Sequence, residues 1–274
     1  MKLKYQVPRI YEGLLPRDLL QMEPQETKAT CDTCIMAKPQ NRGEIFYEPD
    51  LKCCTYYPFL PNYVVGSILS QDSTSGSSAP SAVAAIQNKI AKREYSLPLG
   101  LVAPPNYQVP FNHRLPNEFG QREDWLCPYF NHEQQNCGIW RQRGAVCTSF
   151  YCKSSYGVKG LRFWDELSNY LTYVEMALME ESLVMLDFSP RQISDLLNYL
   201  NRQEATKTEM KSARMPEKKA RDLWNGYYDD QEGFFIKSFQ IVAELDRKSF
   251  RELLGEPAKQ LEDRLRKAFE KICP

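Results

Sequence analysis

The sequence predicts a mainly α-helical protein with little or no β-sheet, in which a helical C-terminal part follows an irregular, cysteine-rich core. Apolar residues recur at helical spacing through much of residues 161–274, and the cysteine-rich part has many turn-forming residues but no alternation of strands and helices. We therefore expect a lead-in segment over residues 1–30 and a cysteine-cluster domain over residues 31–155. A helical region over residues 156–274 is expected to pack on that domain.

The N-terminal half contains short elements separated by turns and prolines. A Ser- and Gly-rich stretch predicts a mobile loop, and Pro80 is well placed to begin the helix after it. Frequent prolines further on favour extended connecting chain over helix. In chain order we expect a short helix over residues 16–22 and a buried helix over 62–70 that is capped by its first asparagine. The mobile loop is expected over residues 71–80, the next helix over 80–93 and the extended connection over 96–120.

Five helices are predicted in the C-terminal region. The first, over residues 161–186, carries an apolar stripe that includes Phe163, Leu167 and Leu171. Ser189 and Pro190 supply an N-cap and a first-turn proline for the next helix. Further helices are expected over residues 190–200, 216–224, 234–245 and from 256 onward. Their stripes suit either packing in a core or docking of a partner protein.

Composition restricts the class of protein. Apolar residues make up 42% and charged residues 26% of 274 residues, which is typical of a globular protein. Equal numbers of basic and acidic side chains, 35 of each, argue against sequence-independent nucleic-acid binding. The N-terminus lacks the apolar run of a secretory signal, and no stretch approaches the roughly 20 apolar residues of a membrane span. We expect a soluble, cytoplasmic protein without membrane insertion.

Eight of the nine cysteines fall in two groups. Cys31 and Cys34 form a CxxC motif, and the adjacent Cys53 and Cys54 follow after eighteen intervening residues. The second group lies within 26 residues and consists of Cys127, Cys137, Cys147 and Cys152. Structural disulfides are not expected in a reducing compartment, so this grouping favours a metal or redox role. We predict these eight thiols as metal ligands, and Cys273 as a bystander.

The spacing leaves the metal open. Eight thiolates suit two four-thiolate zinc sites, one such site with spare thiols, or the ligands of an iron-sulfur cluster such as 4Fe-4S. Inert buried cysteines are the alternative for any single thiol. Thioredoxin-like redox chemistry requires a strand-to-helix context that is absent here. His132, five residues after Cys127, is a weaker ligand candidate, because a histidine in a polar segment is commonly a solvent-facing loop residue.

Cationic and aromatic side chains lie near the cysteines in sequence. Cations stabilise a negatively charged thiolate site, and side chains around the ligands tune it, so we predict Arg143, Arg141 and Trp140 as residues surrounding the metal. Ordinary solvated surface charge is the alternative for the arginines and for Lys52 and Lys153. Aromatic residues such as Tyr56, Tyr57, Tyr129 and Trp140 suit either a pocket wall or packing around the metal.

The second cysteine group resembles the YkgJ-type cysteine-cluster family, whose members are described as zinc- or iron-chelating domains. The pattern C-x-I-Y/W-x-x-R-P-x-x-C-x-x-F-x-C of that family, preceded by a further cysteine, matches Cys127, Cys137, Ile139, Trp140, Arg143, Cys147, Phe150 and Cys152. The first group corresponds to a C-x-x-C-x-x-C-C motif of the family, but here eighteen residues separate Cys34 from Cys53 where the family has two. In the second group, Gly144 stands where the family pattern has proline. Flagellin lysine methylases carry similar clusters, so the resemblance implies that such a module can accompany enzyme chemistry.

Two functions follow from these observations. The first is a metal-binding protein whose zinc, iron or iron-sulfur centre is structural or cargo. The alternative is an iron-sulfur or metal-dependent enzyme acting in redox chemistry or on a protein or peptide. No GxGxxG, P-loop, GxSxG or HExxH motif occurs to favour a particular reaction. The sequence assigns no partner, apart from the docking role suggested for the C-terminal helices.

Overall fold

The computed structural model describes residues 1–26, 31, 34–38, 46–70, 78–201, 204–212 and 214–273. Helices take up 57% and strands 4% of the chain, which confirms the predicted mainly α class. The α-helices are α1 Arg17–Gln21, α2 Asn62–Leu69, α3 Pro80–Ala91, α4 Pro105–Asn112, α5 Ala145–Ser149, α6 Gly157–Met185, α7 Pro190–Leu200, α8 Lys207–Lys211, α9 Glu217–Leu223, α10 Gln231–Ala243 and α11 Arg247–Glu270.

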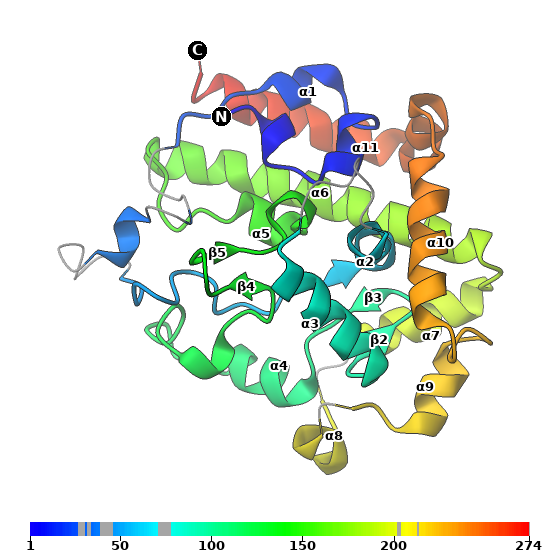
Figure 1. Ribbon diagram of the computed structural model, residues 1–274. Helices are drawn as coiled ribbons and strands as arrows, with labels where there is room; N and C mark the ends of the chain where they lie inside the picture. The colour runs from blue at the N-terminus through cyan, green and yellow to red at the C-terminus, as the bar shows by residue number, and fades with distance from the viewer. Residues whose placement is uncertain are drawn as a thin grey trace.

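Two small antiparallel sheets lie between the helices (Figure 1). In the first, β3 (Gly100–Leu101) lies between β1 (Leu60–Pro61) and β2 (Ser96–Leu97). In the second, β4 (Phe130–Asn131) pairs with β5 (Asn136–Cys137), with Phe130 opposite Cys137. Because each strand has two residues, these sheets fix local turns and leave the fold mainly helical.

Helix α6 crosses the molecule and organises the core. Its apolar residues recur at three- and four-residue spacing, and Phe163, Leu167 and Leu171 are at most 2% exposed. Helix α11 packs along α6, and the Tyr170 hydroxyl donates a hydrogen bond to the buried Glu262 of α11. The predicted apolar stripe is therefore confirmed, and core packing accounts for it.

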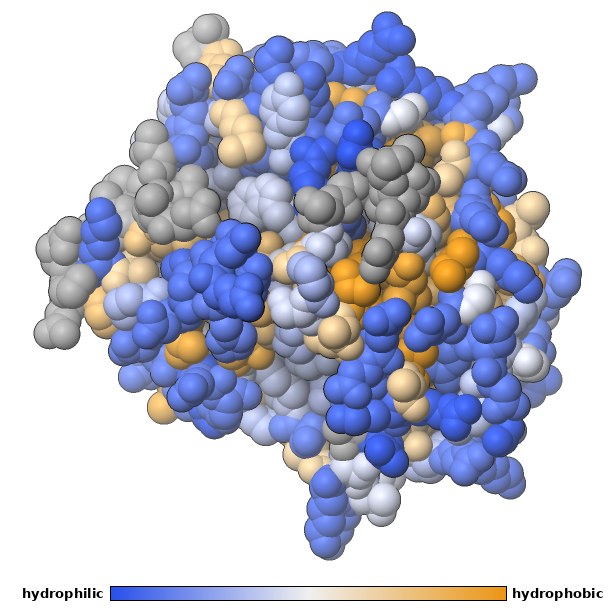
Figure 2. Space-filling model, in the orientation of Figure 1, coloured by the Kyte–Doolittle hydropathy of each residue, from blue (hydrophilic) through white to orange (hydrophobic). Residues whose placement is uncertain are grey.

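Helices α2 and α10 pack closely against one another. Gly66 of α2 allows this approach, because a Cβ atom there would lie 1.8 Å from the carbonyl oxygen of Phe235 in α10. In the space-filling view, apolar atoms gather where α2 and α10 lie in Figure 1, on a face that is otherwise largely hydrophilic (Figure 2). This contact joins an early segment of the chain to the C-terminal helices.

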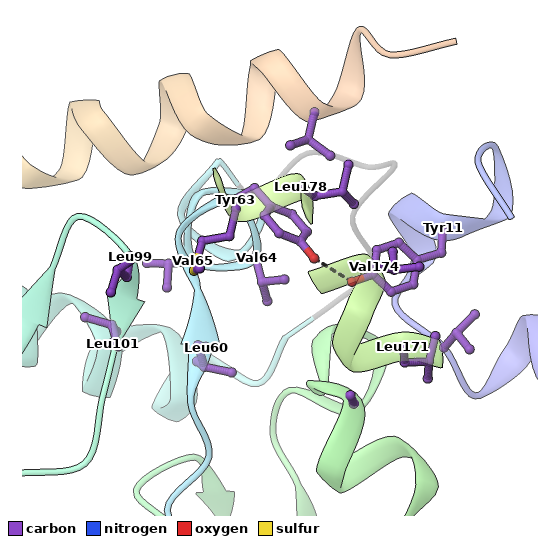
Figure 3. Close-up of a cluster of buried hydrophobic side chains, with 14 of the residues drawn as sticks. Tyr11, Leu60, Tyr63, Val64, Val65, Leu99, Leu101, Leu171, Val174 and Leu178 are labelled. Atoms are coloured by element: carbon purple, nitrogen blue, oxygen red, sulfur yellow. Dashed lines mark hydrogen bonds between the residues drawn. The ribbon is translucent and has the colours of Figure 1, made fainter. Parts of the chain in front are cut away.

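The lead-in segment forms part of the core. Leu3, Val7 and Tyr11 are at most 2% exposed and belong to one apolar cluster that extends to Ile272. The hydroxyl groups of Tyr11 and Tyr63 point toward one another and form a buried hydrogen bond 2.5 Å long (Figure 3). The predicted helix over residues 16–22 is present as α1, and the N-terminal segment packs near α11 (Figure 1).

Two predictions for the N-terminal half were wrong in detail. The proline-rich residues 96–120 contain α4, which Pro105 begins as the first helical residue and in which Pro110 lies near the end. Asn62 is the first residue of α2 and does not cap it; its side-chain amide donates to the carbonyl oxygen of Pro98. The loop predicted over residues 71–80 lies outside the described residues for positions 71–77.

The C-terminal helices largely follow the sequence signals. Ser189 caps α7 in a reciprocal capping box with Gln192, as its position before Pro190 predicted. The helix expected from Glu256 is the second part of α11, which changes direction at Gly255, where φ is 62°. Within the ranges that the structure describes, no helix is long and apolar enough to cross a membrane.

Candidate functional site

All eight predicted cysteine ligands line one cavity of about 690 Å³. The two sequence groups meet through backbone contacts: the Cys127 amide donates to the Cys54 carbonyl oxygen at 2.7 Å, and the Cys137 amide donates to the Cys31 sulfur. The cavity is lined by Cys31, Cys34, Cys53, Cys54, Cys127, Cys137, Cys147 and Cys152. Groups more than 70 residues apart in sequence therefore share one cavity.

Turns aim several of these sulfurs into the cavity. The Cys127 sulfur accepts a hydrogen bond from the amide of Tyr129, and the Cys137 sulfur accepts one from the amide of Ile139. Both are bonds between a cysteine and the second residue after it, and they require a tight turn at each cysteine. Such amide donors stabilise a thiolate more than a thiol.

The adjacent Cys53 and Cys54 both face the cavity because the chain turns there. Lys52 has a φ of 54°, in the left-handed region, and the two thiol groups share a hydrogen bond. On a regular strand the two side chains would point to opposite faces. That hydrogen bond is the largest cause that lowers the pKa of Cys53 and raises the pKa of Cys54.

Burial opposes ionisation of five further thiols, those of Cys31, Cys127, Cys137, Cys147 and Cys152. It raises the pKa of Cys31 and Cys147 to about 12 and that of Cys152 to about 11. The positive charge of Arg143 acts in the opposite direction on Cys31 and Cys147, and a hydrogen bond from the Tyr47 hydroxyl does so on Cys152. Ionisation of these thiols would consequently require a positive charge in or beside the cavity.

The eight thiol groups are ligands of a type that suits a thiophilic metal, but their sulfur atoms are not arranged around a common point as a coordination shell. Eight thiols in one cavity offer the soft ligands that zinc and iron-sulfur clusters take. Among the described residues, however, no three cysteine, histidine, aspartate or glutamate side chains lie close enough to hold one ion. Binding one ion through three or four of these sulfurs would therefore require side-chain movement toward a common point.

Arg143 is the central cation of the site. Its guanidinium donates to the carbonyl oxygens of Trp140, Cys147 and Gln6, at 3.1, 3.1 and 3.3 Å, and lies 3.4 Å from the centre of the Trp140 ring. Arg143 is 8% exposed, and none of the described acidic side chains forms an ion pair with it. A buried positive charge without a carboxylate partner is suited to a cavity that holds negative charge.

The other predicted neighbours occupy different places. Trp140 lines the cavity beneath Arg143. Arg141 is directed to Glu12, with which it forms an ion pair of 2.5 Å, and it is not among the described lining residues. His132 is exposed and its ring contacts Phe130, while the Cys273 sulfur lies 3.9 Å from the carbonyl oxygen of Glu23. The structure therefore brings Trp140 and Arg143 to the cavity, but not Arg141, His132 or Cys273.

Glu175 is a site residue that the sequence reasoning missed. This residue of α6 is 8% exposed and accepts a hydrogen bond of 2.7 Å from the Ala145 amide, at the first residue of α5. Helix α5 carries Cys147, so Glu175 fixes the start of the helix that presents this thiol. Burial raises the pKa of Glu175 to about 8. In the sequence, Glu175 could have been recognised as an acidic residue beside the apolar stripe of the predicted helix.

Three further lining residues escaped prediction. Tyr47 is 2% exposed and donates to the Cys152 sulfur. Arg114 and Phe111 lie on the side of the cavity contributed by the proline-rich segment, which was predicted to be connecting chain. No local pattern marks these residues, because their role depends on a contact with distant cysteines.

Comparison with known proteins adds no further assignment. No family model matches the chain, and neither a curated protein nor a solved structure shows significant similarity to it. The resemblance to the YkgJ-type family therefore remains a prediction that rests on the motif alone.

Proposed function

We propose that this protein binds a metal, zinc or iron, through the thiolates of its eight-cysteine cavity, with an iron-sulfur cluster as the iron form. The observation that carries the proposal is that eight cysteines from two distant segments line one cavity. A single buried cysteine is unremarkable, but eight in one cavity without disulfides are typical of a thiolate metal site.

Charge around the cavity supports the proposal. The described lining residues include the cations Lys52, Arg114 and Arg143 and no aspartate or glutamate. Zinc with four thiolates carries a net negative charge, which nearby cations stabilise. Free thiols would require no such charge, so the lining suits thiolates better than neutral cysteines.

The ligands would come from the eight lining cysteines. A zinc ion would supply a structural link or a Lewis acid, and an iron-sulfur cluster would supply electron transfer. Arg143, held by three backbone carbonyls, would remain beside the ligands as a fixed positive charge, and Glu175 would hold the helix that presents Cys147. The motif around Cys127–Cys152 makes membership of the YkgJ-type family part of this proposal.

Metal analysis with an anaerobic absorption spectrum tests the proposal directly. Freshly purified protein should contain zinc or iron in fixed proportion to the chain, and an iron-sulfur form should absorb in the visible range. Protein free of both metals, with eight freely titratable thiols, would contradict it.

A pair of variants assigns the metal to the cavity. Cys147→Ser should lower the metal content and, for a structural metal, the melting temperature, because metal affinity contributes to folding. Cys273→Ser is the matched control, since that thiol lies outside the cavity lining. Equal metal content in the two variants would place the metal elsewhere.

The cavity volume favours a second candidate, a metal-dependent enzyme. Structural zinc sites are closed by four protein ligands, whereas catalytic sites retain an open position. A volume of about 690 Å³ lies within the range of about 300–1,000 Å³ of small-molecule pockets. The enzyme would act in redox chemistry or in modification of a protein or peptide, as the sequence suggested. A metal-loaded protein in which every metal position is filled by cysteine would exclude an open-site mechanism.

A further inference from the structure

The outer part of the cysteine cavity is open to solvent and apolar. Val146 and Phe150 line the cavity yet are 45% and 40% exposed, and Pro116 is also exposed, so these residues lie at its mouth. A metal at the thiols would occupy only part of about 690 Å³. The remaining space has the size of a small-molecule site.

Arg114 is an exposed cation at this mouth. Its guanidinium lies 4.0 Å from the centre of the Phe111 ring and donates to the Phe111 carbonyl oxygen at 2.9 Å. The same guanidinium lies 5.8 Å from the centre of the Phe119 ring. The charge of Arg114 is thus directed to the aromatic side of the cavity.

Acidic groups near Arg114 are engaged elsewhere. Glu118 accepts the Leu115 amide and pairs with Arg122 at 3.1 Å. Among the described acidic side chains none forms an ion pair with Arg114. With respect to the described part of the chain, guanidinium donors are therefore left for the anionic group of a ligand.

Aromatic rings form the wall beside Arg114. Phe111 stacks on Tyr107 with ring centres 5.6 Å apart and an interplanar angle of 16°. Phe119 makes edge contacts with Phe111 and Phe150, at 6.4 and 5.6 Å. Phe150 is 40% exposed, so its ring leaves an apolar surface that is complementary to an aromatic or similarly planar group.

We propose that the outer cavity binds a small organic anion, whose carboxylate or phosphate meets Arg114 and whose planar apolar part lies against Phe119 and Phe150. This anion site rests on the proposed function, because it assumes that a metal occupies the part of the cavity lined by the thiols. Arg114 selects the ligand class, because it is a cation at the mouth and none of the described acidic side chains pairs with it.

Two probes of similar shape test this site: 1-naphthoate, which is anionic, and 1-naphthalenemethanol, which is neutral. Equilibrium dialysis against the metal-loaded full chain should show naphthoate binding at least about tenfold tighter than the alcohol. Arg114→Gln should remove that preference, and Arg114→Lys should retain most of it. Arg221→Gln is the matched control: Arg221 also stacks on an aromatic ring, that of Tyr228 at 4.2 Å, but is absent from the described lining.

Naphthoate binding that is absent, that equals alcohol binding, or that falls equally in Arg114→Gln and Arg221→Gln would overturn the proposal. Circular dichroism of each variant establishes that it is folded, and metal content is measured in the same samples. Protein without metal that still selects naphthoate through Arg114 would contradict the proposed function alone. Metal-loaded protein without that selection would contradict only the anion site.

Discussion

Arg143 links the thiol-lined cavity to the N-terminal segment at the scale of single residues. One planar side chain binds three carbonyl oxygens, from Trp140, Cys147 and Gln6, and covers the Trp140 ring. A lysine has the same charge but lacks the planar fork and cannot reach three carbonyls in this way. Geometry as well as charge therefore sets the role of Arg143.

Arg143→Lys should lower the free energy of unfolding by roughly 2 kcal/mol, because it leaves buried carbonyl groups without a donor. Urea denaturation followed by tryptophan fluorescence measures the change. Arg141→Lys provides the comparison: its ion pair with Glu12 is partly exposed, and a change below about 1 kcal/mol is expected. A smaller loss for Arg143→Lys than for Arg141→Lys would refute this account.

Glu175 gives the protein a pH-dependent stability. Burial raises its pKa in the folded state from 4.5 to about 8, so between these values the folded chain holds a proton that the unfolded chain releases. The contribution of Glu175 to stability is fully present below about pH 4.5 and is lost as pH rises to about 8.

Glu175→Gln should therefore flatten the decrease in unfolding free energy between about pH 5 and pH 8, by an amount on the order of a few kcal/mol. Urea denaturation across this pH range measures the slope. Asp165→Asn, at an exposed position of the same helix, should leave the wild-type slope unchanged. Parallel curves for wild type and Glu175→Gln would show that Glu175 is not the titrating group.

At the scale of elements, the packing of α2 on α10 depends on a missing side chain. A Cβ atom at Gly66 would meet the Phe235 carbonyl oxygen at 1.8 Å and the Phe239 Cβ atom at 2.8 Å. Neither is the end of a flexible side chain, so the two helices must separate to admit a methyl group. This contact makes α2 and α10 one packed unit.

Gly66→Ala should lower the free energy of unfolding by roughly 2 to 3 kcal/mol through overpacking, despite the better helix propensity of alanine. Gly13→Ala is the control, because its Cβ would meet no atom within 4 Å and its φ is −79°. Thermal unfolding followed by circular dichroism compares the two. Stability that is unchanged or increased in Gly66→Ala would mean that α2 and α10 are less closely packed than described.

At the scale of the whole molecule, a single apolar cluster joins the two ends of the chain. It includes Leu3 and Ile272, and Asp18 of α1 pairs with Arg266 of α11 at 2.7 Å. A smaller cluster of Met36, Ala37 and Tyr47 packs against Cys34, Cys53 and Cys152 beside the cavity. The large core therefore supports the cavity through the elements that both share.

Unfolding should accordingly occur in one cooperative transition, with coincident curves from tryptophan fluorescence and far-ultraviolet circular dichroism. Removing residues 1–15 should abolish that transition or lower its midpoint strongly, because Leu3, Val7 and Tyr11 are core residues. Lys2→Ala is the control for changes at this end of the chain, because the Lys2 side chain donates to Gln21 at an exposed position. Unchanged unfolding of the truncated chain would show that the lead-in is dispensable.

The sequence by itself determined the mainly helical class, the C-terminal helices and the two cysteine groups. Helical periodicity and capping depend on residues three or four positions apart, and for that reason α6 and α7 were predictable from local pattern. Likewise, the turn at Pro80 correctly marked the start of α3.

Only the tertiary structure decided that Cys54 and Cys127 lie side by side, that Glu175 holds α5, and that Arg114 lies at the mouth of the cavity. Each depends on a contact between segments whose separation along the chain carries no local signal. Likewise, α4 forms within a proline-rich stretch because its first proline needs no amide hydrogen and its aromatic residues are buried against Trp125 and Tyr57. Long-range packing thus completed a site of which the sequence had supplied the thiols.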